Sequence, residues 1–342
     1  MTSQFEQISI ALKQNPKTWL VTGVAGFIGS NLLEFLLLNN QYVIGLDNFS
    51  TGFRHNLDDV ANIVGKERFS NFVFFEGDIA NLDTCQQACE NVDIILHQAA
   101  LGSVPRSIED PIASNHSNVT GFLNMLYAAK QHGIKRFVYA SSSSVYGDSQ
   151  ELPKTEDRTG NLLSPYAVTK SVNELYANVF YKTYNLETVG LRYFNVFGKR
   201  QNPNGAYAAV IPKWIEALYN TKEAQIYGDG ETSRDFSYIA NIIQANILAA
   251  TTNNNTAFGS VMNIAAGGRT TLNDLFLLIQ KQMLQLGYIK QSIQPSYQPF
   301  RQGDIRHSNA DISKANKLLG FMPTHSLEEG MIETLQWYGH YL

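Results

Sequence analysis

The stretch TWLVTGVAGFIGSNLLEFLLL, residues 18–38, decides the fold of this chain. It combines a short apolar strand at Thr18–Thr22, a turn containing Gly23, Gly26 and Gly29, and a helix at Ser30–Leu38. Glycines in such a turn allow close backbone approach, and the helix N-terminus then presents N–H groups and a positive dipole end to an anion. Because a strand precedes the turn and a helix follows it, the pattern predicts a dinucleotide-binding turn, although its spacing is GxxGxxG. The alternative is a tight turn without a ligand.

Five further apolar segments repeat the strand signal, and helical patterns such as Gly121–His132 separate most of them. The segments are Gln41–Leu46, Asn71–Phe75, Asp93–His97, Arg136–Ala140 and Thr188–Arg192. Continuous apolar strands that alternate with helices predict a parallel sheet covered on both faces. The expected fold class is therefore α/β, a doubly wound parallel sheet of the Rossmann type with a smaller C-terminal α/β lobe for a substrate.

The texture of the sequence changes after Asn195, where Pro, Asn, Gly and Tyr become frequent, as in QNPNGAY at residues 201–207. We expect a dinucleotide-binding domain over residues 1–194 plus about 236–262. The remaining segments, residues 195–235 and 263–342, are expected to form the substrate-binding lobe.

Composition narrows the possible partners. The 342 residues carry a formal net charge of −4 and no basic stripe, so no nucleic-acid partner is expected. The longest apolar run, around Leu36–Leu38, is too short to span a bilayer, so no membrane partner is expected either. Residues 1–16 lack the apolar segment of a signal peptide, and Phe5, Ile8 and Leu12 recur at helical spacing. A short helix lying on the body of the protein is the prediction there.

The two cysteines, Cys85 and Cys89, lie four residues apart in a predicted helix. Such a pair is a poor zinc signal without further Cys or His, so both are expected to be buried thiols. No metal site is expected, and a reducing, cytoplasmic location fits.

The segment Ser164-Pro165-Tyr166-Ala-Val-Thr-Lys170 carries the strongest catalytic signal. Ser164 suits a helix N-cap and Pro165 the first helical position, which places Tyr166 in the first turn and Lys170 on the same face. Lowering a phenol pKa from about 10 to about 7 takes roughly 4 kcal/mol. A cation about 6 Å away supplies nearly 3 kcal/mol at an effective dielectric of about 20, and the helix dipole adds up to about 1. A bound, positively charged oxidised nicotinamide is expected to supply the remainder. We therefore expect a phenol that acts as a base on an alcohol. The alternative is an ordinary half-buried aromatic beside a solvated lysine.

Polar residues follow several predicted strands. The serines at 141–144 end the fifth strand, where a hydroxyl can bond the substrate oxygen that exchanges its proton. Turn chemistry accounts for Ser141 and Ser144. Asp47 ends the second strand, where a carboxylate accepts bonds from ribose hydroxyls and repels a 2′-phosphate, which favours NAD over NADP. Asp78, after the third strand, suits either the adenine amino group or a helix N-cap.

Several motifs together resemble a known family. TGVAGFIGSN (22–31), LDNFSTG (46–52), SPYAVTK (164–170), LRYFNVFG (191–198) and GDGETSRDF (228–236) resemble the extended short-chain dehydrogenase/reductases, and within them the UDP-hexose 4-epimerases. HQAALGSVPRS (97–107), QNPNGAYAAVIP (201–212) and RQGDIRHS (301–308) resemble the bacterial UDP-N-acetylglucosamine 4-epimerases of surface polysaccharide (lipopolysaccharide O-antigen) synthesis in particular. The resemblance covers nearly the whole chain.

The resemblance implies a tightly held NAD that is recycled within each turnover. Tyr166 removes the proton of the sugar C4 hydroxyl while C4 gives up its hydride, the 4-keto sugar turns over, and hydride returns to its other face. Lys170 also holds the nicotinamide ribose, and Ser142 matches the active-site hydroxyl. The implied cofactor contacts are Gly23, Gly26, Phe27, Ile28, Gly29, Asp47, Asn48, Ser50, Thr51, Gly52, Asp78, Ile79, Gln98, Ser117, Tyr166, Lys170 and Val196. Ser117 departs from the family, which has asparagine there.

The resemblance also implies a set of residues for the UDP-sugar. They are Ser103, Ser142, Ser143, Tyr166, Asn195, Ala209, Val210, Tyr227, Arg234, Arg301, Asp304 and Ser308. Arginine forks suit phosphate oxygens, and Tyr227 can stack on uracil. Ala209 and Ser308 are small where galactose-restricted relatives carry larger groups, which leaves room for an N-acetyl group.

The expected activity is conversion of UDP-N-acetylglucosamine to UDP-N-acetylgalactosamine by a cytoplasmic homodimer. The alternatives are epimerisation of the corresponding uronic acid or of UDP-glucose and UDP-galactose. A 4,6-dehydratase is disfavoured because Ser143 and Ser144 follow Ser142 where those enzymes carry Asp-Glu. A non-catalytic NAD sensor is disfavoured because the chain keeps both Tyr166 and Lys170.

Overall fold

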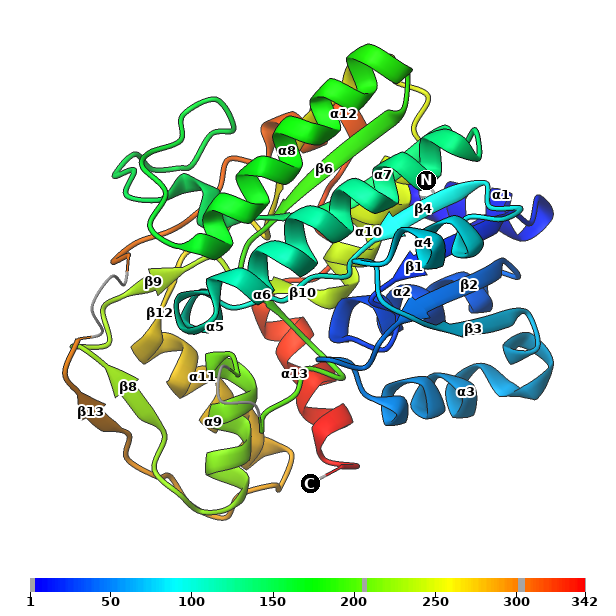
Figure 1. Cartoon of the computed structure of the whole chain (residues 1–342). Helices are drawn as coiled ribbons and strands as arrows, with labels where there is room; N and C mark the ends of the chain where they lie inside the picture. Colours follow the sequence, from blue (N-terminus) through cyan, green and yellow to red (C-terminus); the bar gives the residue numbers. More distant parts are fainter. Residues whose placement is uncertain (1–3, 205–207, 301–304, 342) are drawn as a thin grey trace.

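The computed structural model describes residues 4–204, 208–300 and 305–341 (Figure 1). Its strands are β1 (Thr18–Thr22), β2 (Tyr42–Asp47), β3 (Phe72–Glu76), β4 (Ile94–His97), β5 (Arg136–Ser142), β6 (Glu187–Tyr193), β7 (Val196–Phe197), β8 (Gln225–Tyr227), β9 (Ser233–Arg234), β10 (Ser237–Tyr238), β11 (Ser260–Ile264), β12 (Thr270–Thr271) and β13 (Ser296–Gln298). Its α-helices are α1 (Gln4–Gln14), α2 (Phe27–Leu38), α3 (Arg54–Phe69), α4 (Leu82–Ala88), α5 (Val104–Glu109), α6 (Pro111–Asn115), α7 (Gly121–Gln131), α8 (Pro165–Tyr184), α9 (Val210–Tyr219), α10 (Ile239–Thr251), α11 (Leu272–Gln285), α12 (Ser313–Leu319) and α13 (Leu327–Tyr338). Short 3₁₀ or π turns lie at η1 (His116–Thr120), η2 (Ser143–Tyr146) and η3 (Asn255–Ala257).

Seven parallel strands form the central sheet, in the order β11-β6-β5-β4-β1-β2-β3. The chain starts in the middle, moves to one edge and then winds outward to the other, which confirms the predicted doubly wound fold. The six expected strands are all present, with ends that differ by one or two residues. β11 was not predicted from the sequence, because polar Ser260 and Asn263 interrupt its short apolar run.

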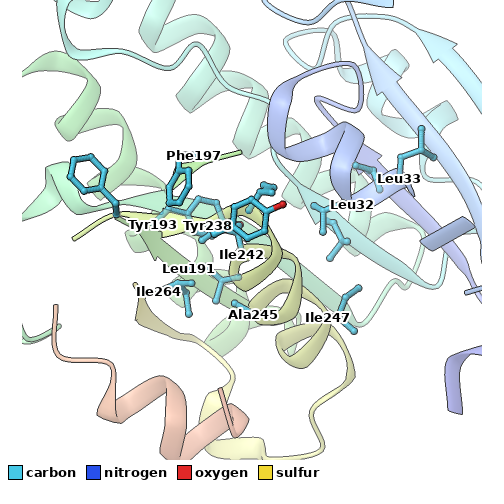
Figure 2. Packing of buried hydrophobic residues seen from close by; sticks show 14 of the residues in the cluster. Leu32, Leu33, Leu191, Tyr193, Phe197, Tyr238, Ile242, Ala245, Ile247 and Ile264 are labelled. Atoms are coloured by element: carbon cyan, nitrogen blue, oxygen red, sulfur yellow. The ribbon is translucent and has the colours of Figure 1, made fainter. Parts of the chain in front are cut away.

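Helices cover both faces of this sheet, and alternate strand residues supply two separate cores. Trp19 and Val21 of β1 belong to the core that includes α2 and α10, whereas Leu20 belongs to the core that includes α4, α7 and α8. Figure 2 shows the first core, where side chains of α10 lie beside those of β6 and β11. Burying a leucine fully stabilises the fold by roughly 1.5–3 kcal/mol, so this layer holds the sheet edge firmly.

The smaller lobe gathers α9, α11 and two-stranded pairs around β8 and β9, at the lower left of Figure 1. The C-terminal helix α13 packs against α11, and its Trp337 donates to Asp59 of α3 at 3.3 Å. α13 therefore connects the smaller lobe with the sheet domain.

The N-terminal helix and the two buried cysteines are as predicted. The predicted N-terminal helix is present as α1, whose Phe5 stacks on Phe35 of α2 with ring centroids 5.5 Å apart. Cys85 and Cys89 are buried as predicted. Within the described ranges, no helix is long and apolar enough to cross a membrane.

Candidate active site

Only glycine fits at two positions here, Gly23 in the turn after β1 and Gly29 in the first turn of α2. Gly23 has φ +68°, a conformation that costs residues with a Cβ, and its ideal Cβ would lie 2.8 Å from the Ala99 nitrogen. A Cβ on Gly29 would lie 2.1 Å from the Gly23 carbonyl oxygen. Gly26 is the N-cap of α2, and having no side chain it leaves the first-turn amides uncapped. The backbone thus forms a cradle that suits a pyrophosphate at a helix N-terminus.

Asp47 does more than the sequence indicated. Its two carboxylate oxygens accept the backbone N–H groups of Ala25, at 2.9 Å, and Phe49, at 2.8 Å. Burial raises the pKa of Asp47, and these backbone hydrogen bonds only partly offset it. The carboxylate therefore braces the glycine turn, and each oxygen keeps a lone pair that can accept a ribose hydroxyl.

Asp78 is not the N-cap of the following helix, which removes one of its two expected roles. Asn81 caps α4 instead, by accepting the amide of Thr84. Asp78 accepts the backbone N–H of Ala80 at 2.8 Å and the side-chain amide of Asn48 at 2.9 Å. Asp78 lines the cavity described next, and its contact with an adenine amino group stays a prediction.

A cavity of about 460 Å³ opens beside the glycine turn. It brings together most of the residues expected to contact the cofactor: Gly23, Gly26, Phe27, Ile28, Gly29, Asp47, Asn48, Ser50, Thr51, Asp78, Ile79, Gln98 and Ser117. Ser103 and Ala209, expected on the sugar, line it too. Gly52, Val196, Tyr166 and Lys170 do not line this cavity, although a Cβ on Gly52 would meet Ala25 of the turn at 2.9 Å.

The catalytic candidates lie on α8 and at the end of β5. Ser164 caps α8 by accepting the Ala167 amide at 3.2 Å, with Pro165 first in the helix, as predicted. Lys170 is buried, and its Nζ donates to the Ala140 carbonyl at 2.9 Å. That ammonium lies 5.9 Å from the centroid of the Tyr166 ring. Ser142 contacts Tyr166 by a side-chain hydrogen bond, so the three groups form one cluster.

The electrostatics of this cluster correct the sequence-based estimate. Burial raises the pKa of the Tyr166 phenol, and the Ser142 hydrogen bond only partly opposes that rise. Burial also lowers the pKa of Lys170 to about 8, against the attraction of Glu174. Burial of the phenol is thus a cost that the sum made from the sequence did not include, and it opposes the effect expected from the lysine and the helix dipole.

Supporting residues that sequence reasoning missed hold α8 in place. Ser107 of α5 is buried, and its hydroxyl accepts the backbone N–H of Tyr166 at 3.0 Å. Asn118, next to Ser117 in the π turn η1, bonds both backbone groups of Leu101 and the hydroxyl of Thr169. π turns occur often at functional sites. Only the proximity of these polar residues in the fold shows their role.

A second cavity of about 350 Å³ lies in the smaller lobe and shares Ala208 with the first. Four residues expected on the nucleotide-sugar line it: Asn195, Val210, Tyr227 and Arg234. Ser143 lies in η2, next to Ser142. Ser308 lines neither cavity, but its amide donates to the Ser233 carbonyl at 3.1 Å, beside Arg234. Arg301 and Asp304 lie outside the described residues.

The first cavity fits a dinucleotide by its own chemistry. The Gly29 cradle would be filled by any Cβ, and the buried Oε1 of Gln201, which lines the cavity, has no hydrogen-bond partner among the described residues. An orphaned buried acceptor calls for a donor from a ligand or water. Among the described residues, no cluster of His, Cys, Asp and Glu could hold a metal ion.

Comparisons with known proteins agree with this geometry. The profile of the NAD dependent epimerase/dehydratase family matches residues 19–265. A putative UDP-glucose 4-epimerase of Methanocaldococcus jannaschii is 35% identical over 93% of this chain and 97% of its own length. The structure resembles a UDP-N-acetylglucosamine 4-epimerase from Methanobrevibacter ruminantium in complex with UDP-N-acetylmuramic acid, with a TM-score of 0.87 and 38% identity over 96% of this chain and 99% of that one.

A third relative carries the cofactor. It is a UDP-glucuronic acid 4-epimerase from Bacillus cereus in complex with UDP-glucuronic acid and NAD, with a TM-score of 0.83 and 31% identity over 95% of this chain and 100% of that one. The cofactor of the present chain is NAD, as the Asp47 position indicated. The chain belongs to the NAD dependent epimerase/dehydratase family, and within it to the UDP-hexose 4-epimerases of the extended short-chain dehydrogenase/reductases.

Proposed function

We propose that this enzyme, a UDP-sugar 4-epimerase, interconverts UDP-N-acetylglucosamine and UDP-N-acetylgalactosamine through a 4-keto sugar. The observation that carries the proposal is the junction of the two cavities at Ala208. One cavity is lined by the dinucleotide-binding turn, and the other by Tyr227 and Arg234, which suit a uridine diphosphate. A UDP-sugar held in the second cavity would direct its hexose toward Ser103 and Ala209.

Tyr166 is the proposed base for the C4 hydroxyl, and Ser142 is the proposed partner of the same oxygen. The buried Lys170 ammonium favours the phenolate electrostatically, while its bond to the Ala140 carbonyl fixes its place. A bound oxidised nicotinamide, held by the glycine turn and Asp47, would supply the acceptor for the C4 hydride and a positive charge that favours the phenolate. Tyr166 is buried, so water screens its phenolate only weakly. The attraction between the phenolate and the Lys170 ammonium is therefore stronger than it would be in water.

Small side chains support the N-acetylated substrate. Ala209 lines the first cavity with a single methyl group, and Ser308 lies beside the arginine-bearing strand β9. Ser103, in the same cavity, has φ +99°, an uncommon conformation for a residue with a Cβ that often marks ligand sites. The small side chains of Ala209 and Ser308 predict that an acetamido group is tolerated, not that it is required.

The corresponding uronic acid is the second candidate, and Arg106 favours it. Among the described residues, Arg106 is the only lysine or arginine lining the first cavity. Its neighbour Ser107 bonds the Tyr166 amide, which supports a position of Arg106 toward the proposed sugar site. A guanidinium there suits a carboxylate on C6.

One assay separates these substrates. The enzyme is incubated with UDP-N-acetylglucosamine, its uronic acid, UDP-glucose and UDP-glucuronic acid in turn, and the C4 epimers are separated. We expect the highest kcat/KM with UDP-N-acetylglucosamine. A preference of more than about tenfold for the uronic acid would transfer the assignment to the second candidate, because a charge-assisted bond contributes about 1.5–3 kcal/mol. If none of the four substrates is converted to its C4 epimer, the proposal is contradicted.

The quaternary structure is proposed from an exposed apolar face. Leu175 and Val179 of α8 are 66% and 52% exposed, and Ile112 of the adjoining α6 is 79% exposed. Exposed apolar side chains that gather on adjoining helices are typical of a protein interface. We propose that two copies pair through this face, and light scattering of the purified protein should give twice the chain mass. A cytoplasmic location and a role in surface-polysaccharide synthesis stay predictions.

A further inference from the structure

The segment that follows β7 contributes to the cofactor cavity but is anchored outside it. Gln201 and Asn202 line the cavity together with the glycine turn. The segment leaves the sheet domain at Phe197 and leads toward α9 in the smaller lobe. The conformation of this segment therefore fixes the part of the cavity wall that Gln201 and Asn202 form.

A buried ion cluster fixes this segment to the helix that begins at the glycine turn. Arg200 has a fully buried side chain, whose Nε donates to Asp59 at 2.6 Å and whose Nη2 pairs with Glu34. Lys199 also pairs with Glu34, at 2.6 Å. Two cations thus meet two carboxylates, Glu34 on α2 and Asp59 on α3, which satisfies the requirement that buried charges be paired.

The backbone of Arg200 shows that the anchor is specific. Its φ is +68°, in the left-handed region that residues with a Cβ rarely adopt. Such a conformation persists when surrounding contacts enforce it. The carbonyl of the preceding Lys199 accepts the side-chain amide of Asn31 of α2 at 3.2 Å, which adds a further bond between this segment and α2.

The C-terminal helix α13 completes the anchor. The hydroxyl of the buried Tyr338 donates to the backbone carbonyl of Gln201, a residue of the cavity wall. Trp337 of α13 and Tyr341, which follows the helix, donate to the two carboxylate oxygens of Asp59, at 3.3 and 2.7 Å. A helix that also packs on the smaller lobe therefore holds both the ion cluster and the cavity wall.

We propose that residues 198–202, the Glu34–Asp59–Lys199–Arg200 cluster and Tyr338 form a latch that slows the release of NAD. An enzyme that reuses its cofactor within each turnover gains from slow release, and the latch residues are positioning residues rather than catalytic ones. The rate of NAD release does not depend on which UDP-sugar is the substrate. The latch can therefore fail while the proposed function stands, and the reverse.

The test measures NAD release directly. Holoenzyme loaded with radiolabelled NAD is diluted into a large excess of unlabelled NAD without sugar, and the label that remains bound is followed by filtration. Tyr338→Phe removes one hydroxyl, and Tyr238→Phe is its matched control. Tyr238 is also a buried tyrosine whose hydroxyl bonds α13, at Glu333 2.7 Å away, but that hydroxyl does not bond the latch segment.

We expect Tyr338→Phe to release NAD about three- to tenfold faster, which corresponds to the loss of one buried hydrogen bond, and Tyr238→Phe to match the wild type. Thermal unfolding should shift about equally in the two variants. Glu34→Gln, which leaves Arg200 and Lys199 without a carboxylate on α2, should release NAD about ten- to hundredfold faster. Wild-type release rates in both Tyr338→Phe and Glu34→Gln, or equal acceleration by Tyr238→Phe, would overturn the latch.

Discussion

The two cavities of this enzyme differ in how the chain builds them. The cofactor cavity collects residues at the ends of consecutive strands, such as Gly23 after β1, Asp47 at the end of β2 and Gln98 after β4. The second cavity collects Asn195, Tyr227 and other residues from separate short segments, and its strands β8 and β9 have three and two residues. A parallel sheet positions the first site by its topology, whereas the second depends on contacts between pieces that are distant in sequence.

The largest expected effect concerns Tyr166, which lines neither cavity and is the proposed base. Tyr166→Phe removes the proposed base and leaves the ring, the cap of α8 and the Ser107 bond in place. We expect kcat to fall about 10²–10⁴-fold while bound NAD is unchanged, because general base catalysis contributes a factor of that size. Steady-state kinetics and the NAD content of the purified variant check both parts. If NAD is lost together with activity, Tyr166 is needed to hold the cofactor and the assigned role as base is contradicted.

A substitution in the glycine turn tests whether the cofactor cavity is already shaped for NAD before NAD binds. Gly29→Ala places a methyl group 2.1 Å from the Gly23 carbonyl oxygen, so the turn must shift. Overpacking of this kind costs about 1–3 kcal/mol, which predicts NAD binding weaker by up to about 100-fold. Gly268→Ala is the control, since a Cβ there meets no atom within 4 Å. Isothermal titration with NAD measures the difference, and equal affinities for the two variants would contradict the rigid cradle.

A substitution at Ser308, in the smaller lobe, should change which UDP-sugar is preferred without affecting NAD binding. Ser308→Tyr fills space beside β9, and we expect kcat/KM for UDP-N-acetylglucosamine to fall about tenfold or more, as overpacking by about 1–3 kcal/mol predicts. Activity with UDP-galactose should stay within about twofold of the wild type, since that sugar has no acetamido group. Unchanged turnover of both substrates would show that Ser308 does not border the sugar.

The smallest expected effect is a dependence on pH. Burial lowers the pKa of Lys170 to about 8, so the ammonium is charged below that pH and loses its proton as the pH rises through it. Its support for the phenolate is lost in the same direction, and kcat should decline above about pH 8, by at most about tenfold per pH unit. Lys170→Met should be slow and lack this decline. A wild-type profile that is flat from pH 7 to about pH 10 would contradict the assigned charge.

Local chemistry explains what could be predicted from the sequence. The glycine turn, the Ser164 cap and the apolar strands each depend on residues a few positions apart, and the structure has all three. Strand β11 was missed because its pairing with β6 joins segments about 70 residues apart and its own sequence is partly polar.

Burial explains what could not be predicted. The raised pKa of Tyr166 depends on the walls around the phenol, and those walls come from several elements. The bonds of Ser107 and of Arg200 likewise join segments 59 and 141 residues apart, at Tyr166 and Asp59. No spacing in the sequence marks such partners.

An isotope at C4 tests the central claim most directly. UDP-N-acetylglucosamine carrying deuterium at C4 is incubated with the enzyme in ordinary water, and the product is analysed by mass spectrometry and NMR. The account predicts UDP-N-acetylgalactosamine that keeps its deuterium at C4, without accumulation of NADH. Deuterium lost to solvent, or NADH released in proportion to substrate consumed, would contradict hydride return to the same carbon.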